Sequence, residues 1–115
     1  MSNIWDERGR DEACARLATE MAGYALGVSP GEITGLDRGG PAVTSARQLA
    51  MYLCHVAFEL SLGRVALAFG RDRSTVSHAC HVIEDRRDEP GYDAWIGSLE
   101  TALRETPAPR ARSAS

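Results

Sequence analysis

The segment FGRDRSTVSHACHVI, which runs from Phe69 to Ile83, decides how this chain folds. Apolar residues stand in it at positions 76, 79, 80 and 83, the i, i+3, i+4, i+7 spacing of one helix face. Asp72 precedes this face at the position of a helix N-cap, where its carboxylate can accept a backbone N–H. The outward positions are small and polar or basic: Arg73, Ser74, Thr75, Ser77, His78 and His81. The segment therefore predicts a capped helix with a polar outer face.

A second short helix is predicted directly before this one. Ser61 is placed to cap residues 62–69, and Gly70 ends them. Two short helices joined by a tight turn, the second polar at its start, are typical of a helix-turn-helix whose second helix lies in a DNA major groove. There arginine suits guanine, aspartate suits a cytosine amine, and serine or threonine suits several base edges. A plain helical bundle also has a polar outer face, so the pattern alone leaves both interpretations open.

The rest of the chain also has helical periodicity, without β-alternation. Helices are predicted over 5–27 and over 45–60, the second behind a Thr44 or Ser45 cap. Between them a short helix is predicted after a Ser29 cap with Pro30 and Glu32. A last helix is predicted over 92–104, with Trp95, Leu99 and Leu103 facing inward. A Gly-Gly-Pro loop covers 37–43. The expected fold is a small all-α bundle. Its N-terminal helix, 1–27, packs with 28–104 as one unit, and 105–115 is a disordered tail.

Composition excludes several classes of function. The 115 residues are enough for one modest core. All thirteen basic residues are arginine, and a P-loop ATPase or a Schiff-base enzyme needs lysine. The sequence contains no run of about 18 apolar residues, the length that a membrane-spanning helix needs. Its three cysteines, without a CxxC motif, are typical of reduced thiols. We therefore expect a cytoplasmic, nucleoid-associated protein that is not an enzyme and holds no cofactor.

A metal site is not expected either. Candidate ligands stand in two groups, Cys54 with His55 and His78 with Cys80 and His81. Adjacent helical residues such as Cys54 and His55 point about 100° apart, Cys80 is on the apolar face, and the two remaining histidines do not complete a zinc site.

Charge is divided unevenly along the chain. The net charge is −3, but residues 38–83 hold five arginines against two acids, a net of +3, and the flanks together carry −6. A basic centre can hold a phosphate backbone, and acidic flanks suggest a second surface or simply keep a small domain soluble.

Residues ARQLAMYLC, followed by SLGRVALAFGRDRSTVSHACHVIE, resemble the C-terminal DNA-binding domain of the bacterial replication initiator DnaA over roughly residues 28–86. The resemblance implies an all-helical domain whose helix-turn-helix reads short boxes in double-stranded DNA at an origin. It implies major-groove contacts by Asp72, Arg73, Ser74 and Thr75, further contacts by Arg47 and Gln48, and His78 beside the backbone. Arg38, Arg71 and Ser77 complete the predicted DNA-binding set.

The departures from the family pattern open an alternative. Of the basic residues in the family's loop, only Arg38 remains. In the family's recognition motif, Arg73 stands in place of a histidine, Ser74 in place of the first threonine and Val82 in place of a lysine. The 115 residues also leave no room for the family's ATPase module. This predicts a stand-alone, monomeric paralogue that regulates initiation with fewer backbone contacts. The alternative is a protein-interaction module with weak DNA binding that regulates the initiator or its inactivating partner.

Overall fold

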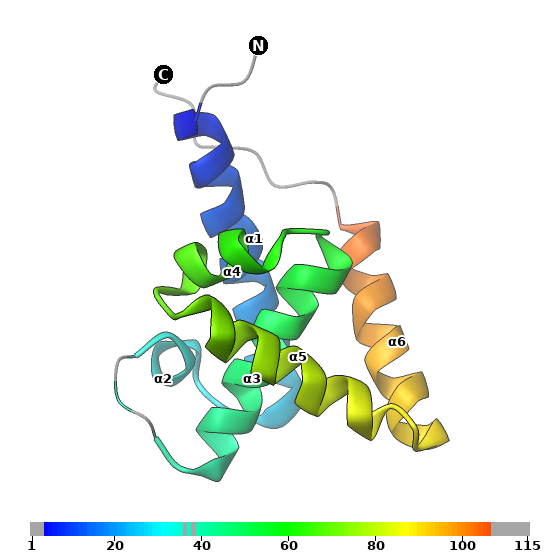
Figure 1. Cartoon of the computed structure of the whole chain (residues 1–115). Helices are drawn as coiled ribbons and strands as arrows, with labels where there is room; N and C mark the ends of the chain where they lie inside the picture. The colour runs from blue at the N-terminus through cyan, green and yellow to red at the C-terminus, as the bar shows by residue number, and fades with distance from the viewer. Residues whose placement is uncertain (1–3, 36, 38, 107–115) are drawn as a thin grey trace.

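The computed structural model describes residues 4–35, 37 and 39–106, with side chains from residue 7 onward. Its elements are α1 (Ile4–Leu26), α2 (Pro30–Thr34), α3 (Pro41–Ala57), α4 (Leu62–Phe69), α5 (Arg73–Arg86) and α6 (Pro90–Glu105) (Figure 1). The prediction of a small all-α bundle is therefore confirmed for the part of the chain that the structure describes. The predicted tail lies outside it from residue 107 onward.

Helix α3 is the centre of the bundle and contacts each of the other five helices. Its apolar band is wide enough to be covered from several sides, and its buried residues include Leu49, Ala50, Met51, Leu53 and Cys54. In Figure 1, α1 passes behind α3, α5 crosses in front of it, and α6 stands to the right. The helix-turn-helix therefore rests on a core element that the N-terminal helix supports from behind.

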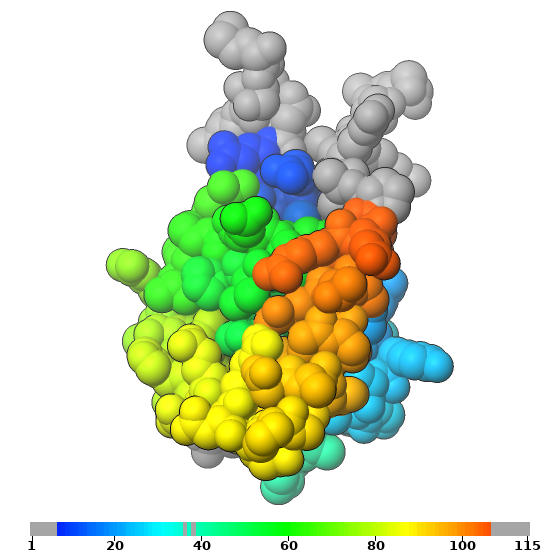
Figure 2. Space-filling model, turned by 90° about the vertical axis from the view of Figure 1, so that its right-hand side faces the viewer, coloured from blue at the N-terminus to red at the C-terminus, as the bar shows by residue number. Residues whose placement is uncertain are grey.

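Small residues let α1 approach α3 closely. Cys14, Ala18 and Ala22 are fully buried in the shared core. Gly23 serves the turn after α1 instead, because a Cβ there would come within 2.5 Å of the Val28 carbonyl oxygen. On the other flank α6 covers the bundle (Figure 2) with Ile96 and Leu103 buried. Trp95 and Leu99, which the sequence predicts to face inward, pack against the core while staying partly exposed.

The predicted caps of α2 and α4 are confirmed. The Ser29 hydroxyl accepts the backbone N–H of Glu32 at 3.3 Å, and the Ser61 hydroxyl accepts that of Arg64 at 3.2 Å. Gly70 ends α4 in a left-handed conformation, with φ at 64°, and the next N–H, of Arg71, bonds back to the Ala66 carbonyl at 2.9 Å. Each signal works within about one helical turn, which is why the sequence reveals it.

Other helix boundaries differ from the prediction. Helix α3 begins at Pro41 behind an N-cap at Gly40, before the predicted Thr44 or Ser45 cap, and ends at Ala57. Helix α6 begins at Pro90, where Glu89 accepts two backbone N–H groups. In both cases a proline takes the first helical position, where its missing N–H costs nothing. The loop predicted over 37–43 was therefore wrong from Pro41 onward, and the predicted start of the last helix at residue 92 was two residues late.

An ion pair between a buried carboxylate and a half-buried guanidinium joins α1 to α4. The Arg64 guanidinium donates to both carboxylate oxygens of Asp11, at 2.9 and 2.7 Å, and lies 3.4 Å from Glu7. The hydrogen bond from Arg64 to Asp11 raises the pKa of Arg64, so the guanidinium stays charged. Such a two-pronged arginine–carboxylate contact sets the orientation of the first helix of the helix-turn-helix.

Candidate nucleic-acid interface

Helix α5 divides into the two faces that its sequence predicts. Val76, Ala79, Cys80 and Ile83 are buried against the core. The opposite face is exposed at Arg73, Ser74, Thr75, His78 and His81, while Ser77 is half-buried. The four predicted major-groove readers, at positions 72–75, are therefore all exposed around the first turn of α5.

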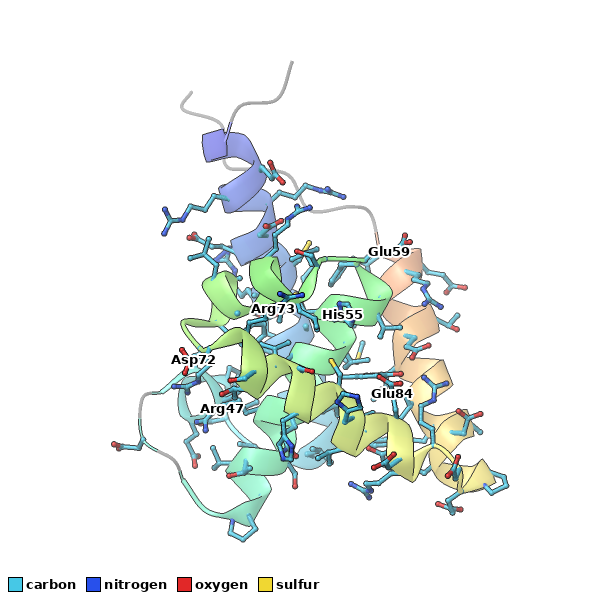
Figure 3. All side chains as sticks on the ribbon, in the orientation of Figure 1. Arg47, His55, Glu59, Asp72, Arg73 and Glu84 are labelled. Atoms are coloured by element: carbon cyan, nitrogen blue, oxygen red, sulfur yellow. The ribbon has the colours of Figure 1, made fainter. Side chains whose placement is uncertain are left out.

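The start of α5 presents two charged side chains with nothing bound to them. Asp72 has the backbone conformation of an N-cap, and its carbonyl oxygen accepts the N–H groups of Thr75 and Val76 at 3.0 and 3.2 Å. Its carboxylate, contrary to the prediction, makes no capping hydrogen bond. Within the described chain neither this carboxylate nor the Arg73 guanidinium has a hydrogen bond or an ion pair. Figure 3 shows both at the same end of the helix.

Arg47 is used inside the protein. Its side chain is only 9% exposed. Its Nε donates to the Ile33 carbonyl at 2.8 Å, and its Nη2 donates to the carbonyls of Glu32 and Asp37, both at 3.0 Å. Burial, helped by the nearby charge of Arg71, lowers the pKa of Arg47. A direct contact between Arg47 and DNA stays a prediction, and it requires this guanidinium to leave the α2–α3 connection.

Arg71 binds the same connection from the turn of the helix-turn-helix. Its Nη2 donates to the Gly35 carbonyl at 2.6 Å, and the side chain is half-buried. Arg47 therefore ties the end of α2 and the segment after it to α3, and Arg71 ties that segment to the turn before α5. The other arginine predicted for this loop, Arg38, lies outside the described residues. Of the three described arginines in the predicted DNA-binding set, Arg73 is the exposed one.

Gln48 lies on α3 beside the C-terminal half of α5. It is half-buried and helps to line a hollow of about 260 Å³ together with Ser45, Arg86 and Trp95. Arg86 stacks over the Tyr92 ring with 4.1 Å from its guanidinium carbon to the ring centroid. Glu84 and Asp85 are exposed next to it, so the end of α5 is acidic whereas its start is not.

A polar cluster that sequence reasoning missed holds the C-terminal end of α5. The Arg87 guanidinium donates to the Tyr52 hydroxyl on α3 at 2.8 Å and to the carboxylates of Asp93 and Glu100 on α6. Burial opposes the charge, but these three partners outweigh it and raise the pKa of Arg87. The partners are separated by up to 35 residues, and no local pattern predicts such a pairing.

The cysteines and histidines do not form a ligand set. In the part of the chain that the structure describes, no three His, Cys, Asp or Glu side chains come together as metal ligands would. Cys14, Cys54 and Cys80 are free and buried. Burial raises the pKa of Cys54 to about 12 and that of Cys80 to about 11, so both stay as thiols. The same described residues contain no helix that is both long and apolar enough for a membrane span.

Comparison with known proteins agrees with this geometry. The family described as bacterial dnaA protein helix-turn-helix matches residues 20–83, from the second half of α1 to near the end of α5. A crystal structure of a DNA replication initiation factor superimposes with a TM-score of 0.74 and 27% identity, over 84% of this chain and 30% of that one.

Curated relatives cover the same region. Chromosomal replication initiator protein DnaA 2 of Chlamydia caviae is 38% identical over 74 residues, which is 64% of this chain and 16% of the relative. The DnaA protein of Cutibacterium acnes is 42% identical over 65 residues, 56% of this chain and 13% of the relative. The chain thus spans about one sixth or less of the length of these relatives.

Proposed function

This chain belongs to the bacterial DnaA helix-turn-helix family, and from that premise we propose that it binds double-stranded DNA at initiator-box-like sites of a replication origin and regulates initiation there. The helix-turn-helix domain that defines this family binds DNA and has no catalytic role. The finer proposal, that this chain reads a specific box, is supported above all by the start of α5, where the charged groups of Asp72 and Arg73 are exposed and unpaired within the described residues.

The proposed mode of reading places the first two turns of α5 in the major groove. Arg73 donates to guanine O6 and N7, Asp72 accepts from a cytosine amine, and Ser74 and Thr75 contact neighbouring base edges. The N-terminal end of a helix also carries a partial positive charge, which favours the approach of phosphates. The acidic C-terminal end, with Glu84 and Asp85, repels phosphates, so only the first half of α5 enters the groove.

Arg47 and Arg71 act indirectly in this proposal. They hold the α2–α3 connection through the carbonyls of residues 32–37. That connection continues into the loop that resembles the family's minor-groove loop. Arg38 and the half-buried Gln48 are the remaining candidates for backbone contacts.

The test compares binding to matched and scrambled duplexes by fluorescence anisotropy. Arg73→Ala should reduce the preference for the matched box by roughly 1–3 kcal/mol, because a bidentate arginine–guanine contact carries about that much discrimination. Arg10→Ala is the matched control, since it removes the same charge from an exposed position on α1. Equal binding of both duplexes by the unmodified protein would refute the specific-reader proposal.

The second candidate function is the protein-interaction module. It is favoured by the internal use of Arg47 and Arg71, which leaves few guanidinium groups for phosphates. In that case the chain should bind the initiator or its regulators with an affinity that DNA does not change. It should also show no preference for a box at any salt concentration.

A further inference from the structure

The exposed side of α1 carries charges in a regular alternation. Arg8, Glu12, Arg16 and Glu20 follow one another at intervals of four residues, and all four are exposed. Residues four apart on a helix form a continuous ridge. Arg8 and Glu12 already interact along this ridge, with 3.8 Å between Nε and Oε1. The signs along the ridge read plus, minus, plus, minus.

This alternation is complementary to itself when the direction is reversed. An antiparallel copy of the ridge sets Arg8 against Glu20 and Glu12 against Arg16, twice each. Packing of one i, i+4 ridge beside another is also the commonest way in which helices cross in globular proteins, at about −50°. A two-fold axis near Cys14 therefore satisfies both geometry and charge, and two-fold interfaces are by nature self-complementary.

An exposed apolar side chain lies beside the ridge. Leu67 on α4 is 65% exposed, the most exposed leucine of the described residues. It lies between two hollows of about 320 and 620 Å³, and it lines both of them. Arg8 and Glu12 border the first hollow, and Glu12, Arg16 and Glu20 border the second. Burying Leu67 against a partner would remove apolar surface from water, which favours association.

We propose that the ridge Arg8–Glu12–Arg16–Glu20 and Leu67 form a homodimer interface, in which a second copy of this chain packs antiparallel through α1. The dilute protein is then a monomer, as the sequence predicts, and the dimer forms as the protein concentration rises. Because α1 and α5 lie on different sides of α3 (Figure 1), the α5 helices of both copies remain accessible to DNA. Two linked helix-turn-helices could engage neighbouring sites together and gain affinity without any new DNA contact.

The experiment uses charge reversal with rescue between chains. Glu12→Arg sets arginine against arginine at both central contacts of the dimer, and Arg16→Glu sets glutamate against glutamate. Each variant alone should weaken self-association by about tenfold in sedimentation equilibrium, because like charges replace two opposite-charge contacts. An equimolar mixture should form heterodimers, since every central contact then joins arginine to glutamate. The double variant Glu12→Arg with Arg16→Glu should recover dimerisation by itself.

These readouts separate an interface from a role of the same residues within one chain. Loss of the Arg8–Glu12 contact within α1 costs only a few tenths of a kcal/mol, and mixing two chains cannot restore it. Leu67→Ser should also weaken self-association while leaving the circular dichroism spectrum unchanged. The proposal is overturned if the unmodified protein stays monomeric into the millimolar range, or if the mixture associates no better than its components.

Discussion

Replacing Arg47 by alanine tests whether this residue is an internal anchor or the DNA contact that the sequence predicts. In the structure its guanidinium donates to the carbonyls of Glu32, Ile33 and Asp37 at 2.8–3.0 Å and to Gly35 at a longer 3.4 Å. Truncation leaves these carbonyls without their donor and opens space beneath the α2–α3 connection. The anchor role therefore predicts a loss of stability in the absence of any DNA.

The size of the loss follows from the individual contacts. A hydrogen bond from a charged donor contributes about 1.5–3 kcal/mol, and such bonds from one group do not add. The Ile33 bond is buried, whereas the others are only part-buried, so water can replace part of them. We expect Arg47→Ala to lower the free energy of unfolding by about 2–4 kcal/mol. That is less than the whole stability of a typical domain, about 5–15 kcal/mol, so the variant should still fold.

Urea unfolding followed by circular dichroism measures this change. Gln48→Ala is the control, because Gln48 is the next residue on α3, is half-buried and makes no hydrogen bond within the described chain. It should change stability by about 0.5 kcal/mol or less. Arg47→Lys should recover little, since lysine lacks the planar fork that reaches several carbonyls. Unchanged stability of Arg47→Ala together with lost DNA affinity would refute the anchor and restore the direct contact.

Three further predictions concern single positions. Thr19→Val should raise the free energy of unfolding by about 1 kcal/mol in urea titrations, because the Thr19 hydroxyl is buried without a partner among the described residues; a loss of stability would contradict this. Glu59→Gly should stabilise by about 1 kcal/mol, since Glu59 has a φ of 58° that glycine adopts without strain, and an unchanged melting temperature would oppose that account. Replacing Gly40 and Ala42 together by arginine should steepen the slope of log K against log salt by up to about 0.9 per new phosphate contact. The preference for the box should stay unchanged, because phosphate contacts carry no sequence information. An unaltered slope would show that the loop does not face DNA.

The choice of Gly40 for that last variant depends on the structure. Gly40 has a φ of −86°, and a Cβ built there meets nothing within 4 Å. Its neighbour Gly39 has a φ of 70°, and a Cβ there would come within 2.7 Å of the Val43 side chain. In the printed sequence the two glycines are indistinguishable. Only one of them can accept an arginine without strain.

The sequence alone was enough for the existence of the helices, for the caps at Ser29, Ser61 and Gly70, and for the two faces of α5. Ser29, Ser61 and Gly70 act on backbone groups within about one turn, and the spacing of Val76, Ala79, Cys80 and Ile83 is a local property of the chain. The starts of α3 and α6 were placed wrongly, because a proline reads equally as the end of a loop or as the first residue of a helix. The family resemblance rests on the same contiguous residues, which is why it was visible at once.

Only the tertiary structure decided what the arginines do. By sequence, the centre of the chain is basic, with five arginines between residues 38 and 83. In the fold, Arg64 pairs with Asp11, 53 positions away, and Arg71 binds a carbonyl 36 positions away. Arg47 lies among the carbonyls of residues 32–37, Arg38 is outside the described residues, and Arg73 points outward. A guanidinium is long and has five donors that accept any nearby oxygen. Its partner is therefore set by which distant segment the fold brings within reach, and charge counted along the sequence overstates the charge that the surface can offer to DNA.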